Sequence, residues 1–480
     1  MLNSPRYTLA IILTLTSFYA FFMLGSHPLE LGDESRGGIN ALEMLANGDF
    51  VNLYYCGEPD GVRAKPPMFI WTVALSMHLF GANELALRIP SALYIIIVFF
   101  LIFKIIHLYR SPQFAFWTCL MLLSVSGLVG YHVGRNGDFD AMLLMFLLAG
   151  VYHLLRYFDF GHQRAVYFGG LFWGLAFMVK GLAAGTLAPG LVLYLALTGK
   201  LMPALKQKRL WIAIGIGLLF PLGWFFTVQQ YGAVWENPEY TGSNVFERLI
   251  VHDILERFTK PDFEGRVATS DHSYIFYSLD KTFNLWNLIF WAFIAYGLFR
   301  VVQNSKSVIE QMRSEKHRLL LISLCLWFPL AVFLSFVTHA LRQYIVPAVP
   351  FVGIATMTGI WWLWQKHNWP KYLFFGLLAF TLGRRLYFFA TPNPFPPIAT
   401  EHRETIQNAA SIYVENEALQ NDELLYLYFA NQQKLHFENI AVDGDYDYQI
   451  LRKESYKNGP FFNLQPAATF RDGVMVKTGQ

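Results

Sequence analysis

The stretch SALYIIIVFFLIFKIIHL, residues 91–108, decides the fold class. It contains a single Lys/Arg/Asp/Glu residue, Lys104, and its length is about that of an α-helix crossing the hydrocarbon core of a bilayer. Tyr7–Leu24 and Leu319–Phe336 are blocks of the same kind. Because lipid cannot hydrogen-bond exposed backbone, such blocks must be helical. The sequence therefore predicts an all-α polytopic membrane protein.

The overall composition agrees with this fold class. Of 480 residues, 54% are hydrophobic and 15% are charged, whereas a soluble domain carries about 25% charged residues. The net charge is +3, but residues 401–480 hold 7 Lys/Arg against 12 Asp/Glu. An acidic tail of this kind does not suit nucleic acid or an anionic membrane surface. The three cysteines are too scattered for a disulfide framework or a metal cluster.

About eleven membrane-spanning helices are predicted. The expected spans are 7–25, 90–108, 113–130, 139–157, 165–180, 182–199, 210–229, 283–302, 319–337, 345–364 and 372–390. The apolar segment Met68–Gly81 is shorter than a span and is expected to be interfacial or re-entrant.

The distribution of Lys and Arg predicts the orientation. One set of loops holds 16 Lys/Arg in about 60 residues, and the opposite set holds 10 in about 112. Cytoplasmic loops carry the excess of positive charge. We therefore expect a multi-pass protein of the bacterial inner membrane, with the N-terminus cytoplasmic and the C-terminal part extracytoplasmic.

The chain is expected to form two domains, a transmembrane domain at 1–390 and a small extracytoplasmic α/β domain at 391–480. The prolines of 392–397 mark the linker between them. In the second domain the pattern predicts a helix near 400–417 and strands at Leu424–Phe429, Tyr448–Leu451 and Val474–Lys477.

Acidic residues follow the first span. The amphipathic pattern predicts a helix over Glu34–Ala46 that lies along the membrane interface, with Asp33 as its N-cap. Asp33 is then either a simple cap or a carboxylate able to deprotonate a bound hydroxyl. A second acidic site, Asp138 and Asp140, stands at the start of a later span, where helix capping is again the alternative.

Cations accompany these acids on the same predicted side. Arg63 and Lys65 precede two prolines and could hold a phosphate, although snorkelling to the headgroups would also explain them. The remaining candidates are Lys180, His252 and Arg257, and Arg342 with Tyr344. One carboxylate base with several cations suits attack by an acceptor hydroxyl on a sugar that leaves a lipid-linked phosphate.

The same segments, in this order, resemble the GT-C membrane glycosyltransferases, and most closely the lipid A aminoarabinose transferase branch of the dolichyl-phosphate-mannose protein mannosyltransferase superfamily. The motifs are Asp33–Arg36, Glu43–Asp49, Lys65–Pro67, Leu79–Gly81, Arg88–Ala92, Arg135 with Asp140–Leu143, Lys180–Gly181, His252 with Arg257 and Phe258, and Arg342 with Tyr344 and Pro347. The resemblance covers roughly residues 7–365.

The resemblance implies a donor linked to polyprenyl phosphate and an envelope acceptor, which could be a lipid, a glycan or a protein. It implies that Asp33 is the base of an inverting transfer and that Asp140 supports it, with Glu34 and Asp138 as further catalytic candidates. The implied contacts to the carrier phosphate are Arg36, Lys65, Arg257 and Tyr344, with Arg342 and Lys180 as further candidates and His252 and Arg63 as additional site residues.

This chain departs from the family pattern at three places. Ala64 stands where the family often has a glutamate, which argues against a divalent metal there, and no cofactor is predicted. Gly37 replaces a tyrosine. The spacing from Arg135 to Asp140 is stretched, so that Asp138 competes with Asp140 for the same role.

Three other functions share some of these features. A transporter would carry ionisable residues within its spans and repeated halves. Here the predicted helix interiors are nearly free of charge, apart from Lys104 near an inner end, and no repeat is visible. An envelope ligase or polymerase would use a diphosphate carrier, and a non-catalytic scaffold would use the acids as caps and surface pairs.

The predicted orientation can be tested with a cysteine at position 480, after Cys56 is replaced. An impermeant thiol reagent should label this cysteine in intact spheroplasts, because an odd number of spans separates the two ends. Labelling only after lysis would instead make Met68–Gly81 a full span.

Overall fold

The computed structural model describes residues 2–478 apart from 61–64, 131, 233–261, 264–265, 268–273, 305–310, 313, 338–339, 416, 432–434, 439–445 and 459–463. The segment 244–258, which carries the candidate residues His252 and Arg257, therefore lies outside the described residues. Arg63 and Ala64 also lie outside them.

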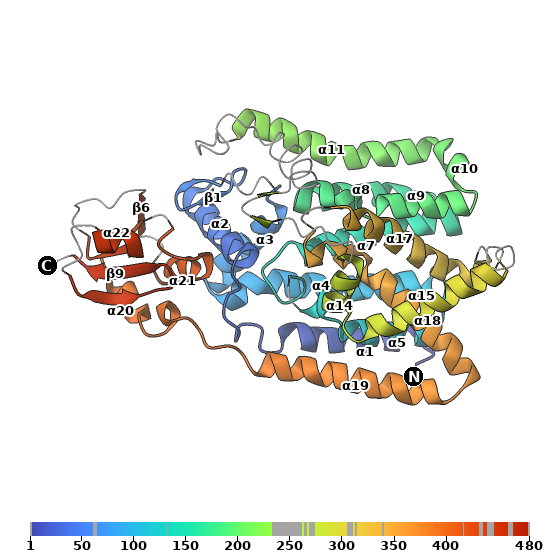
Figure 1. Ribbon diagram of the computed structural model, residues 1–480. Helices are drawn as coiled ribbons and strands as arrows, with labels where there is room; N and C mark the ends of the chain where they lie inside the picture. Colours follow the sequence, from blue (N-terminus) through green and yellow to red (C-terminus); the bar gives the residue numbers. More distant parts are fainter. Residues whose placement is uncertain are drawn as a thin grey trace.

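The chain is a polytopic helical membrane protein, as predicted. Eight helices in the described residues are long and apolar enough to cross a membrane. They are α4 (Glu84–His107), α7 (Asp140–Phe160), α8 with η1 (Ala165–Gly185), α11 (Lys208–Tyr231), α15 (Trp286–Gln303), η3 with α17 (Glu315–Ser335), η4 with α18 (Arg342–Lys366) and α19 (Trp369–Ala390). Figure 1 shows these helices running side by side in one bundle.

Shorter helices occupy the other predicted positions. They are α1 (Pro5–Phe21), α5 (Pro112–Leu123) and α9 (Ala188–Leu197). α3 (Met68–Phe80) is the predicted short apolar helix. Loops and turns between these contain α2 (Asp33–Asn47), α6 (Ser126–Val129), α10 (Leu201–Leu205), α14 (Tyr274–Phe283) and the two-residue strands β1 (Tyr54–Tyr55), β2 (Glu58–Pro59), β3 (Asp262–Phe263) and β4 (Arg266–Val267).

The helices differ in how much protein surrounds them. In the most apolar stretch of η4–α18, 83% of the residues are buried. In the corresponding stretch of α11, only 11% of the residues are buried. Leu219 and Phe226 on α11 are two-thirds exposed. Because α11 is apolar on its exposed face, we infer that this face contacts lipid.

The C-terminal domain is a small α/β unit at the opposite end of the bundle from the N-terminus (Figure 1). Its five-stranded sheet has the order β6-β5-β7-β9-β8, with β5 parallel to β6 and β7, and β9 antiparallel to β7 and β8. The strands are β5 (Ile412–Glu415), β6 (Leu435–Glu438), β7 (Tyr448–Arg452), β8 (Pro466–Thr469) and β9 (Gly473–Lys477). The helices are η5 (Pro397–Ala399), α20 (Arg403–Asn408), α21 (Asn421–Asn431) and α22 (Lys453–Asn458).

Two elements of this domain differ from the sequence prediction. The predicted strand Leu424–Phe429 lies inside α21, and the predicted helix near 400–417 is the short α20 followed by strand β5. The segment Leu424–Tyr428 is buried throughout. A fully buried apolar run has no two-residue alternation, so its pattern alone cannot separate a strand from a buried helix.

Helix α2 also differs from its prediction. It begins at Asp33, so that Gly32 and not Asp33 occupies the N-cap, and Gly48 ends it in the left-handed conformation. Ten of its residues are buried, because α2 packs against α3 on one side and α21 on the other. It is therefore packed between the transmembrane bundle and the C-terminal domain.

Buried tyrosines of α21 join the C-terminal domain to this region. The Tyr428 hydroxyl donates a hydrogen bond to the Glu43 carboxylate on α2, and the backbone N–H of Leu29 donates to the Tyr426 hydroxyl at 2.9 Å. Burial raises the pKa of Glu43 above its ordinary value. The carboxyl of Glu43 depends on these neighbours, since a buried polar group without a partner is destabilising.

We expect Tyr428→Phe to lower the free energy of unfolding by about 1–3 kcal/mol, because Glu43 loses a buried hydrogen-bond donor. Thermal unfolding in detergent measures this loss, and faster proteolysis at residues 391–396 would report weaker docking of the domain. Tyr7→Phe is the matched control, because Tyr7 is 66% exposed. Equal stability of the two variants would show that the Tyr428 hydroxyl does not stabilise the docking.

Candidate active site

Two arginines fix the chain where it leaves α1. Arg88 of α4 donates to the carbonyl oxygens of Leu24, His27 and Pro28 at 2.7–3.2 Å. Arg135 donates to three carbonyls of residues 19–23 at 2.7–3.3 Å, and its guanidinium lies 3.8 Å from the ring centre of Phe389. Arginine at a helix C-terminus satisfies carbonyls that have no partner within the helix. The loop that leads to Asp33 therefore has a defined path.

Glu34 forms a buried bidentate pair with Arg88, with nitrogen–oxygen distances of 2.7 and 2.8 Å. The same carboxylate accepts hydrogen bonds at 2.8 Å from the backbone N–H groups of Glu30 and Gly137. Glu34 was a catalytic candidate from sequence. Both of its oxygens are occupied, and it joins α2, α4 and the 134–138 loop, which is a positioning role.

Asp33, the neighbour of Glu34, belongs to a different cluster. Its carboxylate, the His132 ring and the Asp138 carboxylate each offer an atom within 4.8 Å of the other two. The His132 Nδ1 and Asp138 Oδ2 atoms lie 2.5 Å apart, and Asp138 Oδ1 accepts a hydrogen bond from the Phe139 N–H. Asp33 is partly exposed, whereas His132 and Asp138 are buried. Asp33 is thus the member of the cluster that solvent or a substrate can reach.

The electrostatics of this cluster favour a charged imidazole. Burial alone would lower the pKa of His132, but the hydrogen bond and charge of Asp138, with the charges of Asp140 and Asp33, raise it above its ordinary value. Burial alone would raise the pKa of Asp138, but the hydrogen bond from His132 holds it below its usual range. A buried His–Asp ion pair therefore stands beside Asp33.

Asp140, at the first position of α7, pairs with Lys180 at the end of α8, with 2.5 Å between Oδ1 and Nζ. Both side chains are largely buried. Lys180 was a candidate contact to the carrier phosphate, and its ammonium is bound to Asp140. Lys65 lies 5.0 Å from the ring centre of Phe139, which stands between Asp138 and Asp140. Lys65 thus packs against the segment that carries the two predicted acids.

Arg36 is bound by an acid that the sequence analysis did not single out. Its guanidinium makes two hydrogen bonds to Asp60, at 2.6 and 2.9 Å, and lies 4.0 Å from the ring centre of Tyr55. Asn40 also donates to Asp60 at 2.9 Å. Asp60 is almost fully buried, so part of the Arg36 charge is neutralised before any substrate binds.

Arg342 and Tyr344 begin η4, which packs against α7 and α14. Within the described part of the chain, the predicted residues that meet at one place are Asp33, Asp138, Asp140, Lys65 and Lys180. His132 completes this group and was missed. Its only sequence signal is its position in the polar loop before Asp138, and a lone histidine is a weak signal.

Asp33, His132 and Asp138 are also the residues in the described chain that offer three metal-ligand atoms close together. A divalent cation needs a neutral imidazole. The short hydrogen bond to Asp138 and the raised pKa of His132 favour the protonated ring instead. We therefore interpret this cluster as a set of ionised side chains and derive no step from a metal.

Sequence comparisons place the chain beside known membrane transferases. Residues 64–224 match the model of the dolichyl-phosphate-mannose-protein mannosyltransferase family. An uncharacterized protein of Aquifex aeolicus is 26% identical, with 79% of this chain and 69% of that protein covered. An undecaprenyl phosphate-alpha-4-amino-4-deoxy-L-arabinose arabinosyl transferase of Pseudomonas savastanoi is 27% identical, with 51% of this chain and 44% of that protein covered. The chain thus spans less than half the length of this transferase.

Structural comparisons agree. ArnT from Cupriavidus metallidurans, in a crystal structure bound to undecaprenyl phosphate, superposes with a TM-score of 0.71 at 16% identity, and 97% of both chains is covered. The archaeal oligosaccharyltransferase AglB from Archaeoglobus fulgidus gives a TM-score of 0.53 at 10% identity, with 90% of this chain and 64% of AglB covered. The resemblance to the GT-C membrane glycosyltransferases is confirmed, and the chain has their fold.

The carboxyl group of Glu30 allows the electrostatics of this region to be tested by varying the pH. Burial, and then the charge of Glu34, raise the pKa of Glu30 from 4.5 to about 7, and its Oε2 atom has no hydrogen-bond partner among the described residues. The folded protein therefore favours protonated Glu30. Its contribution to stability is present at low pH and is lost as the pH rises from about 4.5 through 7.

Glu30→Gln should therefore raise the thermal unfolding midpoint relative to wild type at pH 8 more than at pH 5, since glutamine stays neutral. Thermal unfolding in detergent at both pH values measures the difference. Glu404→Gln on the surface of α20 controls for the loss of one charge. A Glu30→Gln effect that is the same at both pH values would contradict the buried neutral carboxyl.

Proposed function

We propose that this protein is a membrane glycosyltransferase that moves a sugar from a polyprenyl-phosphate carrier to a hydroxyl of an envelope acceptor. The observation that carries the proposal is the cluster at the outer end of α7. There a reachable carboxylate, Asp33, lies next to a buried His–Asp pair, and Lys65 stands beside the same loop. Arabinosyl transferases and mannosyltransferases among the similar sequences support the reaction class.

In the proposed reaction Asp33 is the general base. It accepts the proton of the acceptor hydroxyl while that oxygen forms a bond to the anomeric carbon of the sugar. The bond from this carbon to the carrier phosphate breaks, and its electron pair leaves with the phosphate. The His132 imidazolium next to Asp33 favours the ionised carboxylate, which is the form that accepts a proton.

The leaving phosphate gains negative charge and needs a cation. Lys65 is the cation assigned to this task, because it lies 5.0 Å from the ring centre of Phe139, the residue that follows Asp138. Lys180 and Arg36 are paired with Asp140 and Asp60. Arg257, His252 and Arg63 lie outside the described residues, and their proposed contacts to the carrier come from the motif resemblance alone. Arg342 and Tyr344 stay candidates for the same phosphate.

Asp138 and Asp140 have different proposed roles. Asp138 orients the imidazole next to the base, and Asp140 holds the Lys180 ammonium near the start of α7. In the sequence, Asp138 and Asp140 compete for one role. In the structure, Asp138 pairs with His132 and Asp140 pairs with Lys180. We place this site on the extracytoplasmic side of the inner membrane, with the C-terminal domain, following the distribution of Lys and Arg.

Carrier-lipid analysis tests the reaction for any donor sugar. Cells that lack the protein should accumulate a glycosyl-phosphate polyprenol, and wild-type protein should remove it.

Asp33→Asn should be expressed and folded but should lower turnover by at least about 100-fold, which is the usual contribution of a general base. Lys65→Ala should weaken use of the lipid donor by about tenfold or more, as loss of a charge-assisted hydrogen bond predicts.

The readout is mass spectrometry of extracted carrier lipids, with Glu404→Gln as the control variant. Full complementation by Asp33→Asn would show that Asp33 is not the base. Accumulation of a diphosphate-linked glycan in place of the monophosphate would favour an envelope ligase or polymerase.

A further inference from the structure

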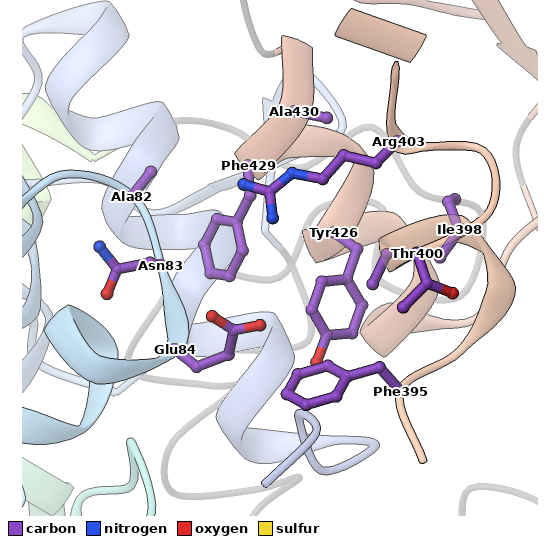
Figure 2. Close-up of a pocket in the computed structure, with 11 residues that line it drawn as sticks. Ala82, Asn83, Glu84, Phe395, Ile398, Thr400, Arg403, Tyr426, Phe429 and Ala430 are labelled. Atoms are coloured by element: carbon purple, nitrogen blue, oxygen red, sulfur yellow. The ribbon is translucent and has the colours of Figure 1, made fainter. Parts of the chain in front are cut away.

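A cavity of about 310 Å³ lies between the transmembrane bundle and the C-terminal domain. Asn83 and Glu84, at the turn between α3 and α4, form one wall. Residues of the linker, α20 and α21 form the other wall (Figure 2). Those that the argument uses are Phe395, Arg403, Tyr426 and Phe429. This cavity is separate from the Asp33 cluster.

The two walls carry opposite charges. Arg403 extends into the cavity from the C-terminal domain, and the Glu84 carboxylate faces it from the bundle, with the Phe429 ring between them in the view of Figure 2. A purely anionic ligand would meet repulsion from Glu84, and a purely cationic ligand would meet repulsion from Arg403. The charges therefore suit a ligand that carries both signs.

Aromatic side chains form the rest of the wall. The Tyr426 ring stands edge to face with Phe395 and with Phe429, at centroid distances of 6.2 and 6.1 Å. The hydrogen bond from Leu29 holds the Tyr426 hydroxyl, so the ring has a fixed orientation. An ammonium group is attracted to aromatic faces as well as to a carboxylate. The aromatic side chains and Glu84 together suit the positive end of the ligand, and Arg403 suits a phosphate.

The cavity stands at the end of a membrane span. Glu84 is the first residue of α4, and the apolar side chains beside it are open, with Leu79 63%, Phe80 58% and Leu85 44% exposed. Exposed apolar residues at a span end face the bilayer, so Glu84 lies at the depth of the lipid headgroups. A ligand whose polar part enters the cavity can keep its apolar chains against Leu79, Phe80 and Leu85.

We propose that this cavity binds the phosphoethanolamine headgroup of a phospholipid, with the phosphate on Arg403 and the ammonium on Glu84. The bound lipid would connect α4 to the C-terminal domain, since each charged wall belongs to one of them. The proposal does not depend on the transferase reaction.

Native mass spectrometry of the purified full-length protein tests the proposal. The protein is mixed with equal amounts of phosphatidylethanolamine and phosphatidylglycerol that carry the same acyl chains. We expect preferential binding of phosphatidylethanolamine, and Arg403→Gln and Glu84→Gln should each weaken it by about tenfold or more, as expected for a charged hydrogen bond. Lys477→Gln, on an exposed residue of β9, is the matched control and should bind like wild type.

Three results would overturn the proposal. They are no preference for phosphatidylethanolamine, an equal loss of both lipids in Glu84→Gln, and binding of soluble glycerophosphoethanolamine as tight as that of the lipid. The last result would identify a soluble ligand. Unfolding midpoints check that each variant is folded. If Glu84→Gln is unstable, Arg403→Gln decides, because Arg403 is an exposed side chain at the start of α20 and unchanged binding of phosphatidylethanolamine by this variant would contradict the proposal.

Discussion

The buried pair of Arg88 and Glu34 is the interaction on which the geometry of the site depends. Removing two charges from water is expensive, and their attraction offsets this cost only when the remaining hydrogen-bonding capacity is also satisfied. Here the guanidinium binds one carboxylate and three carbonyl oxygens, and the carboxylate binds two backbone N–H groups as well. The pair thereby joins the end of α1, the start of α2, α4 and the 134–138 loop. Asp33 and Asp138 take their relative positions from this joint.

The charges of the side chains near the Arg88–Glu34 pair indicate where the proposed base and the proposed phosphate site lie relative to each other. Carboxylates outnumber cations in the Asp33 cluster, because Asp33 and Asp138 are both acids while His132 is the cation of the same cluster. An anionic phosphate would be repelled from this part of the site. Lys65 lies against the ring of Phe139, the residue that follows Asp138. The acceptor hydroxyl is therefore expected next to Asp33 and the carrier phosphate next to Lys65, which separates the attacking oxygen from the leaving oxygen as a displacement requires.

Sequence alone predicts the parts of this molecule that follow from local physical chemistry. The bilayer fixes the length and apolarity of spans such as 91–108, and short runs rich in Tyr, Ile and Val indicate β7 and β9. The site depends on distant partners and is harder to predict. Asp33 and Glu34 are adjacent acids, yet successive residues of a helix point about 100° apart, so that one faces the reachable cluster and the other faces Arg88. No local pattern shows that Glu34 has a partner 54 residues away, or that Asp60 neutralises Arg36.

Hydrogen bonds connect the C-terminal domain to the same region of the molecule. Tyr428 binds Glu43 on α2, Tyr426 binds the backbone of Leu29, and Tyr55 donates to Asn421 at the start of α21. Leu29 lies one residue before Glu30 and four before Asp33, so the domain contacts the segment that carries the proposed base. Burial of α2 between α3 and α21 follows from these contacts, and an interfacial helix without the domain would expose the face that Gly38 brings against Leu425. A shift of this domain relative to the bundle would therefore be transmitted to the loop of Asp33, which makes the domain a structural component of the active site.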